Sequence, residues 1–123
     1  MHIKDVAERA GVSVKAVRYY EARGLVSPRR EANGYRTYDD ADVRVVREVR
    51  ALLSLGLTAE QTHPFVECLR AGNDRADVCP ASLSAYRARI ADIDARMGEL
   101  ADLRRQLADL LAAAENYAPE EHA

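Results

Sequence analysis

Apolar side chains three or four positions apart predict two short helices at the start of the chain. The first pattern covers residues 3–10 and ends at Gly11. The second begins after Ser13, a good N-cap residue, and continues to Gly24. The Ala-Gly-Val-Ser segment between them must turn sharply, and glycine adopts the positive φ that such a turn needs. Two short helices joined in this way predict a helix-turn-helix.

The next segment has the pattern of a two-stranded hairpin. Residues 25–28 are extended by composition, residues 29–34 end in the strong hairpin signal Asn-Gly, and residues 35–38 form the expected return strand. Alternation along that strand places Arg36 and Tyr38 on one face and the other two residues on the opposite face. So small a ribbon is not stable alone, and we expect it to lean on the helices as a wing does.

Two further helices are predicted downstream of the wing. An Asp-Asp pair at 39–40 can cap a helix that ends at Gly56. A capping box at 58–61 starts another helix, which Pro64 is expected to kink. Residues 71–79 have the composition of a loop.

A long helix with one apolar stripe is predicted from Pro80 to about Ala114. Its apolar residues alternate between spacings of three and four, which is the pattern of a coiled-coil seam, and the register shifts by a three-residue step at Arg104. The seam residues are Leu83, Tyr86, Ile90, Ile93, Met97, Leu100, Leu103, Leu107 and Leu110. Such a helix is about 50 Å long, and the small domain before it cannot cover the whole stripe. We therefore expect a homodimer.

The predicted fold is mainly α. Residues 1–70 form a winged helix-turn-helix domain with the following helix pair, and residues 71–79 are a linker loop. Residues 80–114 form a long C-terminal dimerisation helix, and residues 115–123 are a flexible tail.

Composition also favours association over a free-standing monomer. Hydrophobic residues make up 48% of the 123 positions, but 22 residues are alanine, with one phenylalanine and no tryptophan. Because large core-forming side chains are scarce, helices are expected to complete their cores by packing on another chain.

The charge is distributed unevenly along the chain. The net charge of −2 argues against nucleic-acid binding on its own, yet residues 1–50 hold 11 basic and 8 acidic residues, whereas the remainder holds 7 and 12. From Arg9 to Arg36 there are seven basic residues and only two acidic ones, Glu21 and Glu31. A basic segment of this kind is either an electrostatic footprint for phosphate or a solvated surface.

The N-terminus and the cysteines bear on the compartment. The first residues resemble no signal peptide, and no apolar run approaches membrane-spanning length, so a cytoplasmic bacterial-type protein is expected. In that compartment Cys68 and Cys79 are normally reduced, and a permanent disulfide is not expected.

Three motifs together resemble the MerR family of transcriptional regulators. They are Gly-Val-Ser-Val-Lys-Ala-Val-Arg-Tyr-Tyr-Glu at 11–21, Gly-Leu at 24–25 and Asn-Gly-Tyr-Arg-Thr-Tyr at 33–38, and the order of elements matches over about residues 2–114. The resemblance implies an antiparallel coiled coil between two subunits that places two DNA-binding domains across a pseudo-palindromic promoter. Family members typically bind promoters whose spacer is over-long. The resemblance therefore further implies that the dimer distorts promoter DNA and acts on RNA polymerase indirectly, through the shape of the DNA.

The resemblance also implies which residues contact double-stranded DNA. The second helix would enter the major groove, and the wing would lie along the backbone or minor groove. The candidate contacts are Ser13, Val14, Lys15, Arg18, Tyr19, Tyr20, Arg36 and Tyr38. Lys15 and Arg18 can reach guanine edges or phosphates, and Arg36 suits a phosphate or a narrow minor groove. Tyr20 is as much a core candidate as a contact.

The effector is the less defined part of the prediction. Some metal-sensing relatives place a metal ligand at the start of the long helix, where Cys79 stands in this chain. The Cys-containing loop that follows their coiled coil is missing here, since residues 112–123 contain no cysteine and His122 is their only histidine. A metal site would have to combine Cys68 and Cys79, with His63 or a residue of the other subunit added, so no cofactor is required and no complete ligand set is present. Three interpretations stay open for the thiols: no role, redox or electrophile sensing, or soft-metal binding.

Other function classes fit the sequence less well. Enzyme activity is not expected, because no nucleophile–base spacing or Gly-rich phosphate loop is present. A coiled-coil protein-interaction module that uses the helix-turn-helix only as a scaffold is one alternative. An excisionase-like architectural DNA-binding protein is another, although it would lack the long dimerisation helix.

Overall fold

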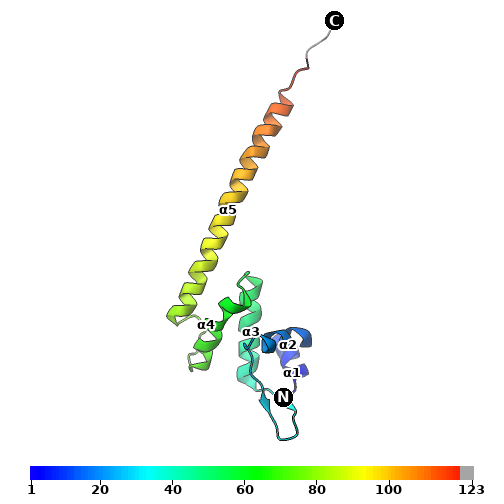
Figure 1. The fold of residues 1–123 in the computed structure, drawn as a ribbon, viewed down its shortest axis with the longest axis vertical. Helices are drawn as coiled ribbons and strands as arrows, with labels where there is room; N and C mark the ends of the chain where they lie inside the picture. The colour runs from blue at the N-terminus through cyan, green and yellow to red at the C-terminus, as the bar shows by residue number, and fades with distance from the viewer. Residues whose placement is uncertain (120–123) are drawn as a thin grey trace. The chain divides into compact units, whose positions relative to one another are not determined.

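The computed structural model describes residues 1–119, and within them the chain forms five helices and one two-stranded hairpin (Figure 1). The mainly helical fold with a wing and a long terminal helix is confirmed. In chain order the elements are α1 (Ile3–Ala10), α2 (Val14–Ala22), β1 (Arg29–Arg30), β2 (Arg36–Thr37), α3 (Asp40–Ser54), α4 (Ala59–Arg70) and α5 (Pro80–Glu115). Of the predicted tail, residues 120–123 lie outside the described residues.

The helix ends follow from local capping chemistry. The Ser13 hydroxyl oxygen accepts a hydrogen bond from the Ala16 amide at 3.0 Å and so caps α2. Asp39 caps α3, and the pair Thr58 and Gln61 forms the predicted capping box of α4. The helix α4 is continuous across Pro64, which stands in its sixth position. Each of these features depends on residues within four positions of one another, which explains why the sequence pattern located them.

The wing is shorter than the sequence pattern indicates. Its strands β1 and β2 are antiparallel and pair only two residues each. The turn between them uses Gly34 at φ +85°, and the Asn33 side-chain oxygen accepts a hydrogen bond from the Tyr35 amide at 3.1 Å. Leu25 and Val26, expected as an extended lead-in, lie before the paired strands and are buried in the core.

The winged domain has a core that α1, α2, α3 and α4 share. Helix α3 packs on both α1 and α4, and α1 also packs on α2. The largest fully buried aliphatic side chains come from several of these elements and from the lead-in to the wing, among them Val6, Val17, Leu25, Val46 and Val66. Burial of such side chains is the main stabilising contribution to a domain of this size.

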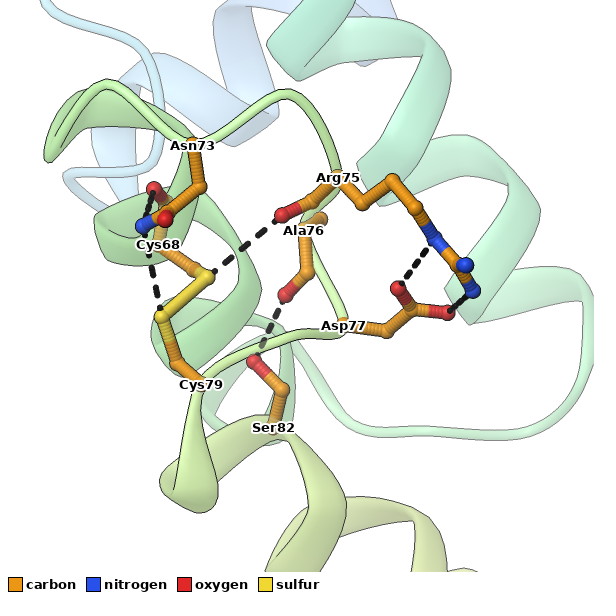
Figure 2. Close-up of a disulfide and its surroundings, with 7 residues drawn as sticks. All are labelled: Cys68, Asn73, Arg75, Ala76, Asp77, Cys79 and Ser82. Carbon is orange, nitrogen blue, oxygen red and sulfur yellow. Dashed lines mark hydrogen bonds and ion pairs between the residues drawn. A yellow bond between two sulfur atoms is a disulfide. The ribbon is translucent and has the colours of Figure 1, made fainter.

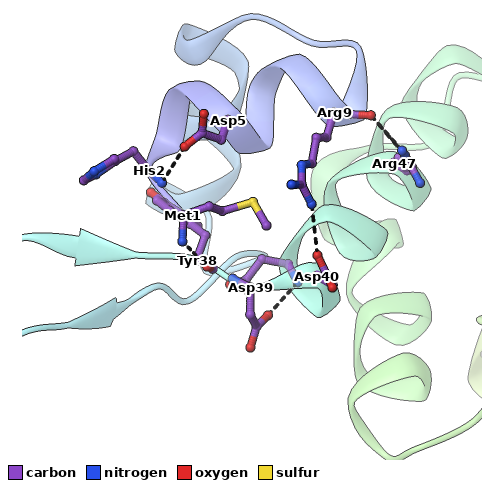
Figure 3. A network of polar contacts seen from close by, with 9 residues as sticks. Met1, His2, Asp5, Arg9, Tyr38, Asp39, Asp40 and Arg47 are labelled. Atoms are coloured by element: carbon purple, nitrogen blue, oxygen red, sulfur yellow. Dashed lines mark hydrogen bonds and ion pairs between the residues drawn. The ribbon is translucent and has the colours of Figure 1, made fainter.

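Polar contacts hold the start of the chain and α1 against the wing and α3 (Figure 3). Met1 and Tyr38 exchange two backbone hydrogen bonds of 2.9 Å, which joins the first residue to the chain leaving β2. Arg9 pairs with Asp40 at 3.2 Å, and the Arg47 guanidinium donates to the Arg9 carbonyl at 2.8 Å. The segment from Met1 to Arg9 is therefore bonded both to the chain that leaves the wing and to α3.

A second, smaller core joins α4 to the first turns of α5. Phe65 is fully buried, and its ring lies 4.9 Å from that of Tyr86. Leu52, Leu57, Ala76 and Ala85 are the other buried members of this cluster. The residues from Met1 to Arg89 form one compact unit and those from Ile90 onward a second, so the first turns of α5 belong to the winged unit.

The C-terminal end of α3 has a close contact with α5. The Arg89 guanidinium donates to the Leu55 carbonyl at 2.8 Å and lies over Gly56, whose φ is +86°. A Cβ at Gly56 would overlap the Arg89 guanidinium. The contact supplies a cation to carbonyls that the helix itself leaves without partners.

Candidate nucleic-acid interface

Helix α2 presents two basic side chains on its outer face. Lys15 and Arg18 are exposed and one turn apart, and Val17, which lies between them in sequence, is fully buried against the core. The buried valine fixes the rotation of α2 about its axis. The two basic groups are thus held pointing away from the domain, where a phosphate or a base edge can reach them.

Two candidates at the start of α2 have structural duties. Ser13 is exposed, and its hydroxyl oxygen caps the helix. Val14 is partly buried and packs on the core. The Ser13 hydroxyl proton is still available for a hydrogen bond to DNA, whereas Val14 exposes only part of its side chain to a partner.

The two tyrosines of α2 differ in exposure. Tyr19 is 46% exposed and Tyr20 is 6% exposed, and their rings meet edge to face at a centroid distance of 6.1 Å. The Arg23 guanidinium lies 5.2 Å from the centre of the Tyr19 ring, as in a cation–π contact. Tyr20 is therefore a core residue in this chain, and Tyr19 is the tyrosine that a partner can reach.

Glu21 links the wing to α2. Its carboxylate pairs with the Arg36 guanidinium at 3.3 Å and accepts a hydrogen bond from the Tyr38 hydroxyl at 3.0 Å. Arg36 and Tyr38 therefore do share a face of the return strand, and that face is turned toward α2. Tyr38, predicted as an outward phosphate contact, is only 3% exposed, because its ring fills the core and its hydroxyl proton is given to Glu21.

Sequence reasoning did not single out Glu21 as a functional residue. A signal was present, because it is one of two acidic residues in the basic segment from Arg9 to Arg36 and sits on the recognition-type helix. Its partners are 15 and 17 residues away in sequence, so no local pattern identifies them.

A groove of about 270 Å³ runs between α2 and the wing. Arg18 and Arg36 line it from the two elements, and Gly34 and Tyr35 line it from the tip of the hairpin. Arg36 keeps 41% of its side chain exposed despite its pairing with Glu21. Two cations are thus brought to one concave surface, an arrangement that suits a phosphodiester backbone.

Burial raises the pKa of Tyr38 to about 12, and the hydrogen bond to Glu21 adds to the effect. A phenol of raised pKa favours folding fully below its unfolded value of about 10, and this contribution is lost as the pH rises through about 12. We expect the melting temperature to fall above about pH 10, and Tyr38→Phe to flatten that fall in thermal melts between neutral and alkaline pH.

The exposed Tyr35 offers a matched control for this alkaline effect. Tyr35→Phe removes a hydroxyl from a side chain that is 66% exposed, so the alkaline fall should keep its wild-type slope. A Tyr38→Phe variant with the same alkaline slope as the wild type would show that Tyr38 does not keep its proton in the folded state.

A disulfide joins Cys68 in α4 to Cys79, the residue before α5 (Figure 2). A permanent bridge was not expected for two cysteines in a reducing compartment. The structure brings the two together because the loop at 71–79 turns back, so that the Cα atoms lie 6.0 Å apart, within the range for a disulfide. Asn73 donates to the Cys68 carbonyl at 2.9 Å and faces the Cys79 sulfur at 3.5 Å.

The described residues do not fit a resident metal ion. Within residues 1–119, no group of three His, Cys, Asp or Glu side chains is placed to hold one. His63, considered as a third ligand, lies beside Gly24, and His122 is outside the described residues. The sulfurs of Cys68 and Cys79 are bonded to each other in this structure.

The predicted seam on α5 is mostly exposed in the single chain. Tyr86 packs on Phe65 of α4, and the other eight seam residues are between 40% and 67% exposed. No helix within the part of the chain that the structure describes has the length and apolar character to cross a membrane. The exposed apolar residues of α5 form an uncovered helix face in the single chain.

The comparisons with known proteins agree with this geometry. Residues 1–63 match the MerR HTH family regulatory protein model. The transcriptional regulator HmrR of Rhizobium leguminosarum bv. viciae is 34% identical over 113 residues, which cover 92% of this chain and 85% of that protein.

Solved structures share the fold. The lead(II) complex of the transcription regulator PbrR691 from Ralstonia metallidurans CH34 has a TM-score of 0.70 at 26% identity, covering 98% of this chain and 93% of that one. HiNmlR, a MerR family regulator lacking the sensor domain and bound to promoter DNA, has a TM-score of 0.55 at 23% identity, covering 93% of this chain and 89% of that one. The family model matches more than half of this chain, and HmrR is 34% identical to it. The chain therefore belongs to the MerR family of helix-turn-helix transcriptional regulators that bind DNA.

Proposed function

We propose that two copies of this chain bind a pseudo-palindromic promoter site and distort the DNA. The observation that carries the proposal is the common surface formed by Arg18 of α2 and Arg36 of the wing. In this arrangement α2 enters the major groove with Lys15 and Arg18, and Arg36 follows the backbone or the minor groove. HiNmlR, which shares the fold, is described as bound to promoter DNA.

Glu21 acts in this proposal as a positioning residue. By pairing with Arg36 and accepting from Tyr38, it sets the distance between the wing and α2. Two elements held rigidly can engage adjacent grooves only when the DNA fits that spacing. Deforming a site costs a few kcal/mol, which well-placed contacts offset.

The second copy is expected to cover the apolar face of α5. Exposed leucine, isoleucine and methionine side chains follow a coiled-coil pattern over most of this helix. A matching face on an identical chain is self-complementary about a two-fold axis. The two winged domains would then present two α2 helices to the two half-sites.

Arg18→Ala is expected to weaken promoter binding roughly 5- to 150-fold for each half-site, because a bidentate base contact contributes about 1–3 kcal/mol. The measurement is fluorescence anisotropy with the duplex that footprinting shows to be protected upstream of the gene itself. If Arg18 contacts a base, the substitution lowers the ratio of specific to non-specific affinity. If Arg18 contacts a phosphate, the substitution instead reduces the slope of log affinity against log salt concentration by about one.

Arg105→Ala is the matched control. It removes the same charge from an exposed residue of α5 that pairs with Asp102, and binding should stay within twofold of the wild type. If neither footprinting nor anisotropy detects a protected duplex, the interaction-module alternative replaces the proposal. Specific binding by a monomer would favour the architectural alternative.

A further inference from the structure

Cys79 stands at a position that favours a reactive thiolate. Its carbonyl oxygen accepts hydrogen bonds from the amides of Ser82 and Leu83 at 3.0 and 3.2 Å, so Cys79 lies at the N-terminal end of the first turn of α5. Its sulfur faces the Asn73 side-chain N–H at 3.5 Å, and Cys79 as a residue is only partly buried. A helix N-terminus and an N–H donor both stabilise negative charge on sulfur, and the thiolate is the nucleophilic form.

Cys68 is in a different environment. It is 2% exposed, within α4, and its sulfur lies 3.5 Å from the Arg75 carbonyl oxygen. In the disulfide this sulfur carries no proton, so the contact becomes a hydrogen bond only when Cys68 is reduced to the thiol. A buried thiol that is hydrogen-bonded in this way reaches few solutes in solution, but its sulfur lies directly beside Cys79.

We propose that Cys79 is an oxidation site for small hydroperoxides and that Cys68 is its resolving thiol. In the first step the Cys79 thiolate attacks one peroxide oxygen. An S–O bond forms as the O–O bond breaks, Cys79 is oxidised to a sulfenic acid, and the departing alkoxide or hydroxide takes a proton from water.

In the second step Cys68 attacks the Cys79 sulfur. The S–S bond forms as the S–O bond breaks, and the departing hydroxide takes the Cys68 proton and leaves as water. Reduction back to two thiols requires a dithiol reductant. A hydroperoxide is favoured over a bulkier oxidant because Cys79 is only partly exposed, and over an alkylating electrophile because the second thiol lies within bonding reach.

The surrounding loop is shaped without help from the disulfide. The fully buried Ser82 hydroxyl donates to the Ala76 carbonyl at 2.7 Å, and Arg75 pairs with Asp77 at 2.9 Å (Figure 2). These contacts hold the loop on the first turn of α5, so the two sulfurs stay near each other when reduced. The chemical change is then confined to a covalent link between α4 and the start of α5.

The test uses the full chain, reduced and then treated with hydrogen peroxide or tert-butyl hydroperoxide. Mass spectrometry with thiol alkylation should show loss of both free thiols and a Cys68–Cys79 peptide pair. Cys68→Ser should accumulate a Cys79 sulfenic acid that dimedone traps. Cys79→Ser should lower the rate of peroxide-dependent thiol loss by at least about tenfold.

Asn73→Ala tests the activating contact, and Asn33→Ala in the wing is its control. The first should slow sulfenic acid formation several-fold, and the second should leave the rate unchanged. Dimedone labelling of Cys68 instead of Cys79 would overturn the proposal. It would also be overturned if the two reduced thiols did not react with peroxide and instead bound mercury(II) or copper(I). Every readout is chemical, so failure here is distinguishable from failure of DNA binding.

Discussion

A chain carrying Leu100→Asp is expected to be a monomer with at least about 100-fold weaker promoter binding, because two linked half-sites gain about 10²- to 10⁴-fold over one. Leu100 lies on the exposed apolar face of α5, where a second copy is proposed to pack. An aspartate there would be buried between two helices without a partner, which costs several kcal/mol. Sedimentation velocity measures the oligomeric state, and anisotropy measures the affinity.

Ala95→Asp is the matched control for the seam variant. It introduces the same charge in the same helix, at the outward position of the coiled-coil repeat, on an exposed residue. This variant should remain dimeric and bind as the wild type does. A dimeric Leu100→Asp chain with unchanged affinity would show that the face of α5 is not the subunit contact.

Phe65→Ala is expected to lower the free energy of unfolding by about 3–5 kcal/mol. Phe65 is fully buried, is the only phenylalanine of the chain and packs on Tyr86 at the start of α5. Its loss leaves a cavity where α4 meets α5, in a domain whose whole stability is of the order of 5–15 kcal/mol. Urea denaturation followed by circular dichroism measures the change.

Tyr117→Ala is the control for the core variant. It removes an aromatic side chain that is 73% exposed, and the change should stay within about 0.5 kcal/mol. A loss below about 1 kcal/mol for Phe65→Ala would mean that the second core contributes little to stability. In that case the attachment of α5 to the winged unit would rest on polar contacts such as Arg89 to Leu55.

Helix positions were predictable because their signals are local. Ser13, Asp39 and Thr58 each cap the helix that follows, and their partners lie within three residues. Gly11, at φ +71°, ends α1 as predicted. Where a residue bonds only its near neighbours, the order of residue types suffices to place the element.

The wing and its tyrosines were less predictable because long-range packing decides them. Alternation correctly paired Arg36 with Tyr38 on one face, but it did not reveal that the face turns toward Glu21. Nor did it show that the chain before β1 enters the core, with Leu25 fully buried. Tyrosine suits both a core and a phosphate contact, so only the tertiary arrangement separates the two uses.

The thiols illustrate a different limit of sequence reasoning. A separation of 11 residues across a glycine-containing loop permits Cys68 and Cys79 to meet, but it equally permits them to stay apart. The deciding contacts are those of Asn73 and Ser82, which fold the loop back onto α4 and α5. Neither residue type is a cysteine-pairing signal.

The contact between Gly56 and Arg89 constrains how these two positions can change over evolution. Gly56 is restricted twice, by its positive φ and by the guanidinium that occupies the space of a Cβ. Shortening the side chain at 89 removes only the second restriction, after which asparagine, which tolerates positive φ, becomes acceptable at 56. A side chain at 56 therefore has to displace the flexible end of Arg89 and break its hydrogen bond to the Leu55 carbonyl, whereas the positive φ remains a restriction whatever residue stands at 89.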